Sequence, residues 1–365
     1  MNFPNRRQAF QYGTSAAAAA ALNKWPGQAR AHRVAEKKIK AGQIGTGHAH
    51  ARGKMSTLRK FSDEFEVIGV VEPDDARWAA VKDQPAYRDV PRMTEEQMLN
   101  APGLALVAVE TTVGNLIPTA ARCVAAGKHI HLDKPAGENL SDFKKVLDNA
   151  TRQRLTVQMG YMFRYNPGFA FLFNALRKGW LGEPFEAHGV ISKKVGPATR
   201  QNLAEYPGGT MFELGCHLID ALTVAMGAPD KVTPFTRRTR PDLDQLADNQ
   251  LAVFEYARAT ATIRSAVVEV AGGSRRQFVL CGSEGTIDIK PLEAPKLLLT
   301  LEQNRGNYPR GTQMEIPLKP LGGRYDGDFR DLAKVLRGEK ESDYPPAHDL
   351  AVQAAVLQAS GVPVN

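Results

Sequence analysis

The chain has 365 residues, more than one hydrophobic core usually organises, so we expect two domains. Its 43% hydrophobic and 24% charged residues are typical of a soluble globular protein. The net charge of +8 overstates its basic character, because residues 1–31 carry four cations and no acid. The remaining positive charge is spread thinly without interleaved aromatic residues, which argues against nucleic-acid binding.

Residues 1–31 have the pattern of a signal peptide. The arginine pair Arg6-Arg7 precedes a weakly apolar run at 16–22, and small residues at 29–31 suit cleavage. Adjacent arginines favour export through the twin-arginine machinery. The apolar run is far shorter than the ~20 residues that span a bilayer, so we expect no membrane anchor. We therefore predict an exported, periplasmic protein; a disordered alanine-rich tail is the alternative.

From residue 38 onwards, short apolar runs alternate with helical stretches. The predicted strands cover residues 39–44, 65–71, 104–109, 129–132 and 155–159. Thr94 and Gln97 form a predicted capping box for a short helix before the third strand. This alternation predicts βαβ units around a parallel sheet, and hence a doubly wound α/β Rossmann domain at residues 37–160.

The second half of the chain has a different pattern. Helices are predicted at 167–176 and 210–226, with strands at 185–191, 251–256, 259–270, 276–281, 286–289 and 297–301. Consecutive strands joined by short turns predict a mostly antiparallel sheet. We assign residues 161–322 to an α+β substrate and oligomerisation domain with a large open sheet, and 323–365 to C-terminal helices. Three dispersed cysteines make neither a disulfide framework nor a zinc spacing, so we predict no metal site.

The first strand leads into a glycine-containing turn, Gly45-Thr46-Gly47-His48-Ala49-His50. Gly45 and Gly47 suit a tight turn whose backbone approaches a pyrophosphate at a helix N-terminus. The third fingerprint position holds His50 instead of glycine or alanine. Glu72 ends the second strand, where a carboxylate accepts hydrogen bonds from the adenosine ribose and favours NAD over NADP. NADP stays possible because Arg77 follows five residues later.

The carboxyl ends of the next strands supply further polar residues. Thr111 and Thr112 follow the third predicted strand, and Asp133 and Lys134 follow the fourth. Ligands bind at this edge of open α/β sheets. We therefore expect these residues in the cofactor site, with Lys134 reaching both the nicotinamide and the substrate.

The predicted helix at 210–226 carries Glu213, His217 and Asp220 at positions i, i+4 and i+7. An α-helix places these three residues on one face. A histidine flanked by carboxylates there can be held in one tautomer as a general base. An exposed stripe of paired polar residues is the alternative.

The chain resembles the Gfo/Idh/MocA family from about residue 38 to its C-terminus. The matching motifs are Asp133-Lys134-Pro135, Arg164-Tyr165-Asn166-Pro167, Gly208-Gly209, the segment Glu213 to Asp220, and the segment Cys281 to Thr286. Three departures stand out. The family's Thr-Pro-x-x-x-His motif has lost its proline and histidine after Thr111, Glu213 replaces aspartate, and Asp133 replaces glutamate.

The resemblance implies an NAD(P)-dependent oxidoreductase acting on the CH–OH group of a sugar, sugar acid or cyclitol. It implies that His217 takes the hydroxyl proton while Lys134 stabilises charge on the reacting oxygen. Glu213 and Asp220 would orient the imidazole or bind hydroxyls, and Tyr161 and Arg164 would line the substrate pocket. It also implies a homo-oligomer formed through the C-terminal sheet.

Two other functions stay open on the sequence. One is a glycosidase-like or lyase-like enzyme that uses bound NAD transiently, which suits an exported protein because free NAD is scarce outside the cytoplasm. The other is a dinucleotide-binding sensor whose catalytic residues have drifted. The presence of both Lys134 and His217 argues against the sensor.

Overall fold

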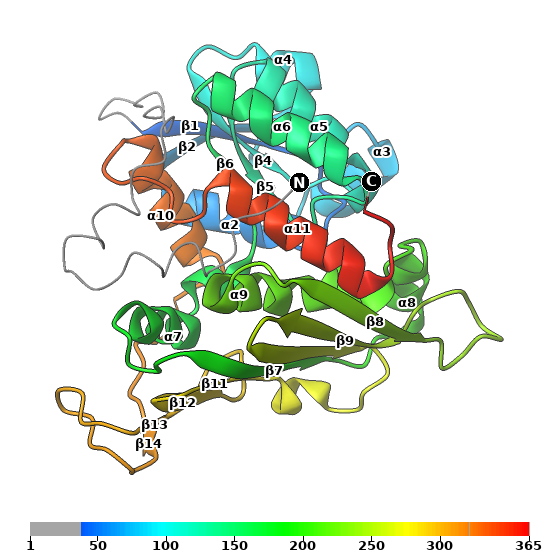
Figure 1. The fold of residues 1–365 in the computed structure, drawn as a ribbon. Coiled ribbons are helices and arrows are strands. Elements are labelled where there is room, and N and C mark those ends of the chain that lie inside the picture. The colour runs from blue at the N-terminus through cyan, green and yellow to red at the C-terminus, as the bar shows by residue number, and fades with distance from the viewer. Residues whose placement is uncertain (1–37, 321, 365) are drawn as a thin grey trace.

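Two β-sheets form the frame of the molecule (Figure 1). The computed structural model describes residues 38–320 and 322–364. The predicted leader, residues 1–31, lies outside these ranges. In the described part, no helix is long and apolar enough to cross a membrane.

The N-terminal sheet is parallel, with strand order β3-β2-β1-β4-β5-β6. Its strands are β1 (Ile39–Ile44), β2 (Phe65–Val71), β3 (Arg92–Met93), β4 (Leu104–Val109), β5 (His129–Leu132) and β6 (Val157–Met159). The connecting helices are α2 (Ala51–Lys60), α3 (Asp75–Val81), α4 (Glu95–Leu99), α5 (Val113–Ala125) and α6 (Leu140–Arg152). This is the strand order of dinucleotide-binding domains, so the predicted Rossmann fold is confirmed. The short elements β3 and α3 were not predicted, because they bury little apolar surface.

The C-terminal sheet has eight strands in the order β14-β13-β12-β11-β7-β10-β9-β8. They are β7 (Pro184–Ser192), β8 (Lys231–Arg237), β9 (Asn249–Tyr256), β10 (Ala259–Ala266), β11 (Gln277–Gly282), β12 (Gly285–Ile289), β13 (Leu297–Leu301) and β14 (Met314–Glu315). Every pair is antiparallel except β7 with β10, which confirms the predicted mostly antiparallel sheet. The prediction that β10 continues to residue 270 was wrong. Its neighbours end at Ser192 and Asn249, which pair with Ala266, and beyond that residue the pairing is reduced to an isolated bridge between Val268 and Lys194.

The helices of the second domain lie between its sheet and the Rossmann domain (Figure 1). They include η2 (Met162–Tyr165), α7 (Pro167–Arg177), α8 (Pro197–Ala204), η3 (Met211–Gly215) and α9 (Cys216–Met226). The prediction of one α-helix over residues 210–226 was wrong, because η3 is a π-helical turn. A π-helical turn inserts an extra residue, so Glu213 and His217 do not have the α-helical relation that their spacing suggested.

The last two helices join the domains. Helix α10 (Asp326–Leu336) places Phe329 and Leu332 in one buried cluster with Ile39, Leu58 and Leu106 of the Rossmann domain. Helix α11 (Pro346–Ser360) buries its apolar residues in the large cluster that includes α5, α6 and α9. The two domains therefore share a continuous core, which fixes one relative to the other.

Candidate active site between the domains

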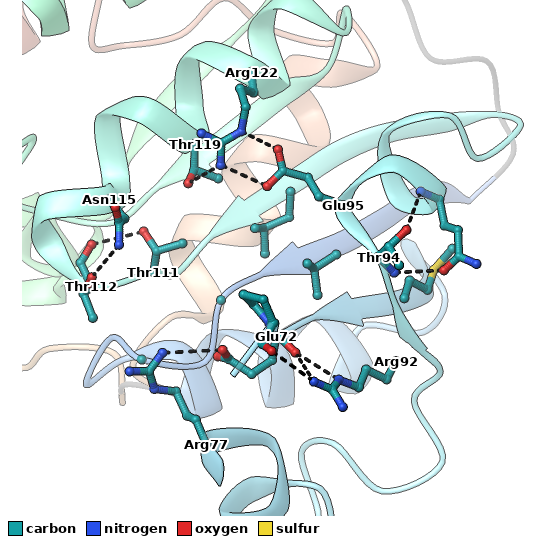
Figure 2. A pocket seen from close by; sticks show the side chains of 17 residues that line it. Glu72, Arg77, Arg92, Thr94, Glu95, Thr111, Thr112, Asn115, Thr119 and Arg122 are labelled. Carbon is teal, nitrogen blue, oxygen red and sulfur yellow. Dashed lines mark hydrogen bonds and ion pairs between the residues drawn. The ribbon is translucent and has the colours of Figure 1, made fainter. Parts of the chain in front are cut away.

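A pocket opens at the carboxyl edge of the parallel sheet (Figure 2). Its volume is about 630 Å³. The lining residues come from the ends of β1, β2 and β4, from β3, and from the helices α3, α4 and α5. They include the predicted cofactor residues Gly45, Gly47, Glu72, Thr111 and Thr112.

The glycines allow the backbone to approach both a ligand and the neighbouring strand. Gly45 has φ +92°, and a Cβ there would lie 2.6 Å from the backbone nitrogen of Thr111. The Gly45 N–H donates to the Val71 carbonyl at 2.8 Å. The His48 N–H donates to the Glu110 carbonyl at 3.0 Å, tying the turn to the end of β4. Only glycine fits position 45, which is what a dinucleotide cradle requires.

Glu72 is held at the end of β2 by the turn opposite it. Its carboxylate accepts hydrogen bonds from the Thr46 N–H at 2.9 Å and the Thr46 hydroxyl at 2.6 Å. The Asp74 N–H donates to its other oxygen at 3.1 Å, and Arg77 lies 3.4 Å from that oxygen. Only 2% of Glu72 is exposed. The pocket therefore has a fixed carboxylate where the sequence predicted a contact with the ribose.

Several pocket residues gave no recognisable signal in the sequence. Arg92 donates to the Glu72 carbonyl through two nitrogens, at 2.7 and 2.9 Å. Arg122 of α5 forms a two-point ion pair with Glu95 of α4 across the pocket (Figure 2). These residues meet only through the packing of α4 on α5, which local sequence spacing does not reveal. The capping box of Thr94 with α4 was predicted and is confirmed.

Lys134 lies at the same sheet edge, one strand away, and is wholly buried. Its ammonium donates to the backbone carbonyl of Glu213 at 2.6 Å and lies 3.4 Å from the Glu213 carboxylate. Burial alone would lower the pKa of Lys134, but Glu213, Cys216 and Asp133 together outweigh it and raise the pKa. Burial likewise opposes ionisation of Glu213, yet Lys134 and Lys193 lower its pKa to about 2. Lys134 is therefore a charged donor paired with Glu213.

His217 is 1% exposed, and its Nδ1 has no hydrogen-bond partner among the described residues. Aromatic rings surround it, with ring centroids 6.2 Å away at Tyr161 and 5.7 Å away at Phe163. Burial lowers the pKa of His217 far below its ordinary value, and the charge of Lys134 lowers it further. The imidazole is therefore neutral near pH 7 and able to accept a proton.

Asp133 is the centre of a buried polar cluster. Its carboxylate lies 3.1 Å from Nδ1 of His48 and 3.2 Å from Nδ1 of His50. Burial alone would raise the pKa of Asp133, but its interactions with His48, His50 and Lys54 hold it well below the ordinary value. Glu110 is also fully buried, and this burial together with Asp133 raises the pKa of Glu110 strongly. Asp133 is thus the charged carboxylate of the two.

Arg164 and Asp220 are brought together, away from His217. Arg164 donates to the Asp220 carboxylate at 3.1, 3.1 and 2.6 Å, and to Asp349 of α11 at 2.6 Å. All three side chains are at most 1% exposed. The expected pairing of Asp220 with the His217 imidazole is not seen, because Asp220 neutralises the buried guanidinium instead. Tyr161, by contrast, lies edge-on to His217, as the proposed pocket role requires.

The fold and its match to a family model define the class: an NAD(P)-dependent oxidoreductase with an NAD-binding Rossmann domain. Residues 39–161 match the model of the oxidoreductase family with an NAD-binding Rossmann fold, and 169–288 match the GFO/IDH/MocA C-terminal domain. The chain belongs to the Gfo/Idh/MocA family.

Known relatives agree with that membership. The oxidoreductase YdgJ of Escherichia coli, itself uncharacterised, is 26% identical over 87% of this chain and 94% of its own length. An inositol 2-dehydrogenase of Gluconacetobacter diazotrophicus is 27% identical over 60% of this chain and 64% of its own. An Agrobacterium radiobacter oxidoreductase, solved with NAD+, L-tartaric acid and magnesium, has a similar fold with a TM-score of 0.76. It is 18% identical and the match covers 89% of this chain and 96% of that one.

Proposed function

We propose that the protein transfers hydride between a nicotinamide cofactor and a CH–OH carbon of a carbohydrate-like polyol, with Lys134 and His217 as the catalytic pair. The observation that carries this proposal is that one buried site contains both a charged hydrogen-bond donor and a neutral proton acceptor. Lys134 is charged and His217 is neutral, although both are almost completely removed from solvent. Oxidation of an alcohol needs one group that donates to the reacting oxygen and another that accepts its proton.

The cofactor residues fit NAD. The Gly45 turn leaves no space for a Cβ, and Glu72 offers a fixed carboxylate for ribose hydroxyls. The bound nicotinamide supplies the hydride acceptor for alcohol oxidation. Glu72 favours NAD because its charge would repel a 2′-phosphate. NADP remains an alternative because Arg77, whose side chain is 40% exposed, can turn towards such a phosphate.

Lys134 and His217 have different roles in the oxidation of the alcohol. Lys134, fixed by the Glu213 carbonyl, donates a hydrogen bond to the reacting oxygen and stabilises negative charge as it develops. His217 accepts the hydroxyl proton, since burial keeps its imidazole neutral. Glu213 balances the charge of Lys134 and does not orient His217. In the reductive direction the same groups return the proton to the oxygen.

Positive charge around the site favours a sugar acid among the possible substrates. Arg324 forms no ion pair with any carboxylate of the described residues; its Nε lies 2.8 Å from Sδ of Met162. Its charge lowers the pKa of both His217 and Lys193, which supports a role for it beside the proposed substrate site. Burial lowers the pKa of Lys193, and the neighbouring cations Lys134 and Arg324 contribute. A substrate carboxylate would relieve this excess of positive charge.

We also propose export and self-association. The arginine pair and the apolar run at 16–22 support passage through the twin-arginine machinery to the periplasm, with the cofactor bound before export. Helices α7 and α9 lie on the inner face of the C-terminal sheet (Figure 1), which leaves the outer face available to a second copy. Cell fractionation with the leader intact or deleted tests the first proposal, and light scattering tests the second.

The activity is tested by incubating the purified protein with NAD or NADP and a panel of inositols, aldoses and aldonates. Appearance of reduced nicotinamide with one of these substrates supports the proposal, and loss of that activity in Lys134→Ala and His217→Ala assigns it to this site. Turnover of a glycoside without net reduced nicotinamide would instead favour the glycosidase or lyase alternative. Bound cofactor with no turnover at all would favour the sensor.

A further inference from the structure

His50 occupies a position at which this chain departs from the dinucleotide fingerprint. The third fingerprint position is normally glycine or alanine, which lets the helix pack closely on the strand. Here the imidazole projects from the start of α2 towards the second domain. Its ring centroid lies 6.2 Å from that of His217 and 5.8 Å from that of Tyr325. His50 therefore reaches the space in which the alcohol is expected to react.

Asp133 holds the His50 ring in a defined orientation. Both carboxylate oxygens lie 3.2 Å from Nδ1 of His50. The Lys134 backbone N–H donates to one of these oxygens at 2.7 Å and fixes the carboxylate in turn. Because Asp133 is ionised, it selects the tautomer of His50 that carries its proton on Nδ1. Nε2 is then left without a proton and can accept one.

His217 lacks such support. The carboxylates expected beside it are both engaged elsewhere, Glu213 with Lys134 and Asp220 with Arg164. A proton taken up by His217 would leave a buried imidazolium without a hydrogen-bonded counter-charge, which is costly. The same proton on His50 would face the Asp133 carboxylate directly. The site thus has one imidazole placed to take the proton and a second that faces Asp133 and can receive it. Burial lowers the pKa of His50 to about 4, although Asp133 opposes this, so His50 passes the proton on and does not retain it near pH 7.

We propose that His50 and Asp133 form a dyad that receives the substrate proton from His217. This proposal rests on the proposed oxidation of an alcohol. The alcohol carbon loses a hydride with the electron pair of its C–H bond to the nicotinamide, and the hydroxyl proton passes to His217. That proton then moves to Nε2 of His50, so that a carbonyl product, neutral His217 and a His50 imidazolium paired with Asp133 remain. A water molecule or hydroxyl can bridge the two rings at their 6.2 Å separation.

The dyad can be tested without any substrate, by nitrogen NMR of the full-length protein labelled on histidine. The His50 signals are assigned by their loss in His50→Ala. We expect neutral His50 to carry its proton on Nδ1 near pH 7, and Asp133→Asn to abolish this preference. A proton on Nε2 of His50 in the wild-type protein would overturn the dyad.

Kinetics test the relay itself, with the substrate that the polyol panel identifies. We expect His50→Ala to lower turnover by about 100-fold. The solvent isotope effect should rise, because proton removal becomes limiting, and added imidazole should restore turnover. Alanine is a residue that the fingerprint accepts, so NAD binding should persist. The control is His188→Ala, which removes a histidine of β7 that contacts Thr262, and it should change none of these quantities.

Three outcomes would refute the relay. The first is a turnover of His50→Ala equal to that of the wild-type protein, and the second is a loss of turnover that imidazole does not restore. Either would show that His50 passes no proton. A stoichiometric metal ion that the wild-type protein retains and His50→Ala loses would show that the ring nitrogen is a ligand. If the wild-type protein oxidises none of the panel, the proposed function fails, while the NMR result still decides whether the dyad exists.

Discussion

The buried ion-pair network of Arg164 gives a prediction whose size follows from the structure. Asp220→Asn removes one charge at nearly constant volume and leaves the guanidinium with Asp349 as its remaining counter-charge. Removing one partner of a buried pair typically costs 3–5 kcal/mol. Because Asp349 still neutralises part of the charge, we expect the lower end, about 3 kcal/mol. Fractional exposures of at most 1% for all three side chains justify using the buried value.

The assay is thermal unfolding of the ligand-free protein, followed by circular dichroism. A loss of about 3 kcal/mol should lower the midpoint by about 6 °C, at roughly 2 °C per kcal/mol for a protein of this size. The control is Asp148→Asn, which breaks an exposed ion pair with Lys144 at 2.6 Å and should cost less than about 0.5 kcal/mol. An unchanged midpoint for Asp220→Asn, combined with a raised KM, would refute the structural role and restore Asp220 to the substrate site.

Three further predictions concern the cofactor and substrate sites. Gly45→Ala should weaken NAD binding at least about 10-fold in a fluorescence titration, because its Cβ would overlap the backbone at Thr111 and positive φ is strained; unchanged affinity would contradict the cradle. Lys134→Ala and His217→Ala should each lower turnover at least about 100-fold while NAD affinity stays within about twofold; retained turnover in either would remove that residue from the mechanism. Arg324→Ala should raise KM for aldonates about 10-fold or more and leave KM for cyclitols unchanged; equal effects on both would contradict recognition of a carboxylate.

The Rossmann domain was predictable because its information is local. Buried strands such as β4 read as continuous apolar runs, and Gly45 and Glu72 follow their strands at the spacing that the cofactor dictates. The buried Lys134 was found because it follows a predicted strand at the edge where ligands bind. Each of these inferences needs only a segment and its immediate neighbours.

The arrangement around His217 was not predictable from spacing. The π-helical turn η3 changes the position of Glu213 relative to His217 on the helix surface, and no residue pattern in the sequence predicts such a turn. The partner of Asp220 is Arg164, 56 positions earlier, and only the packing of η2 against α9 brings the two together. The contact of His50 with Asp133 spans 83 positions in the same way. Residue types indicated the chemistry, whereas the pairing of charges depends on tertiary packing.

The proposed role of Lys134 in a polyol oxidoreductase can be measured directly. The wild-type protein and Lys134→Ala, each shown to bind NAD, are mixed with the polyol panel while the near-ultraviolet absorbance of reduced nicotinamide is followed. We expect a rise for the wild-type protein with at least one polyol, and none for the variant. An equal rise for both proteins, or none for the wild-type protein with any polyol or with either nicotinamide cofactor, would contradict it.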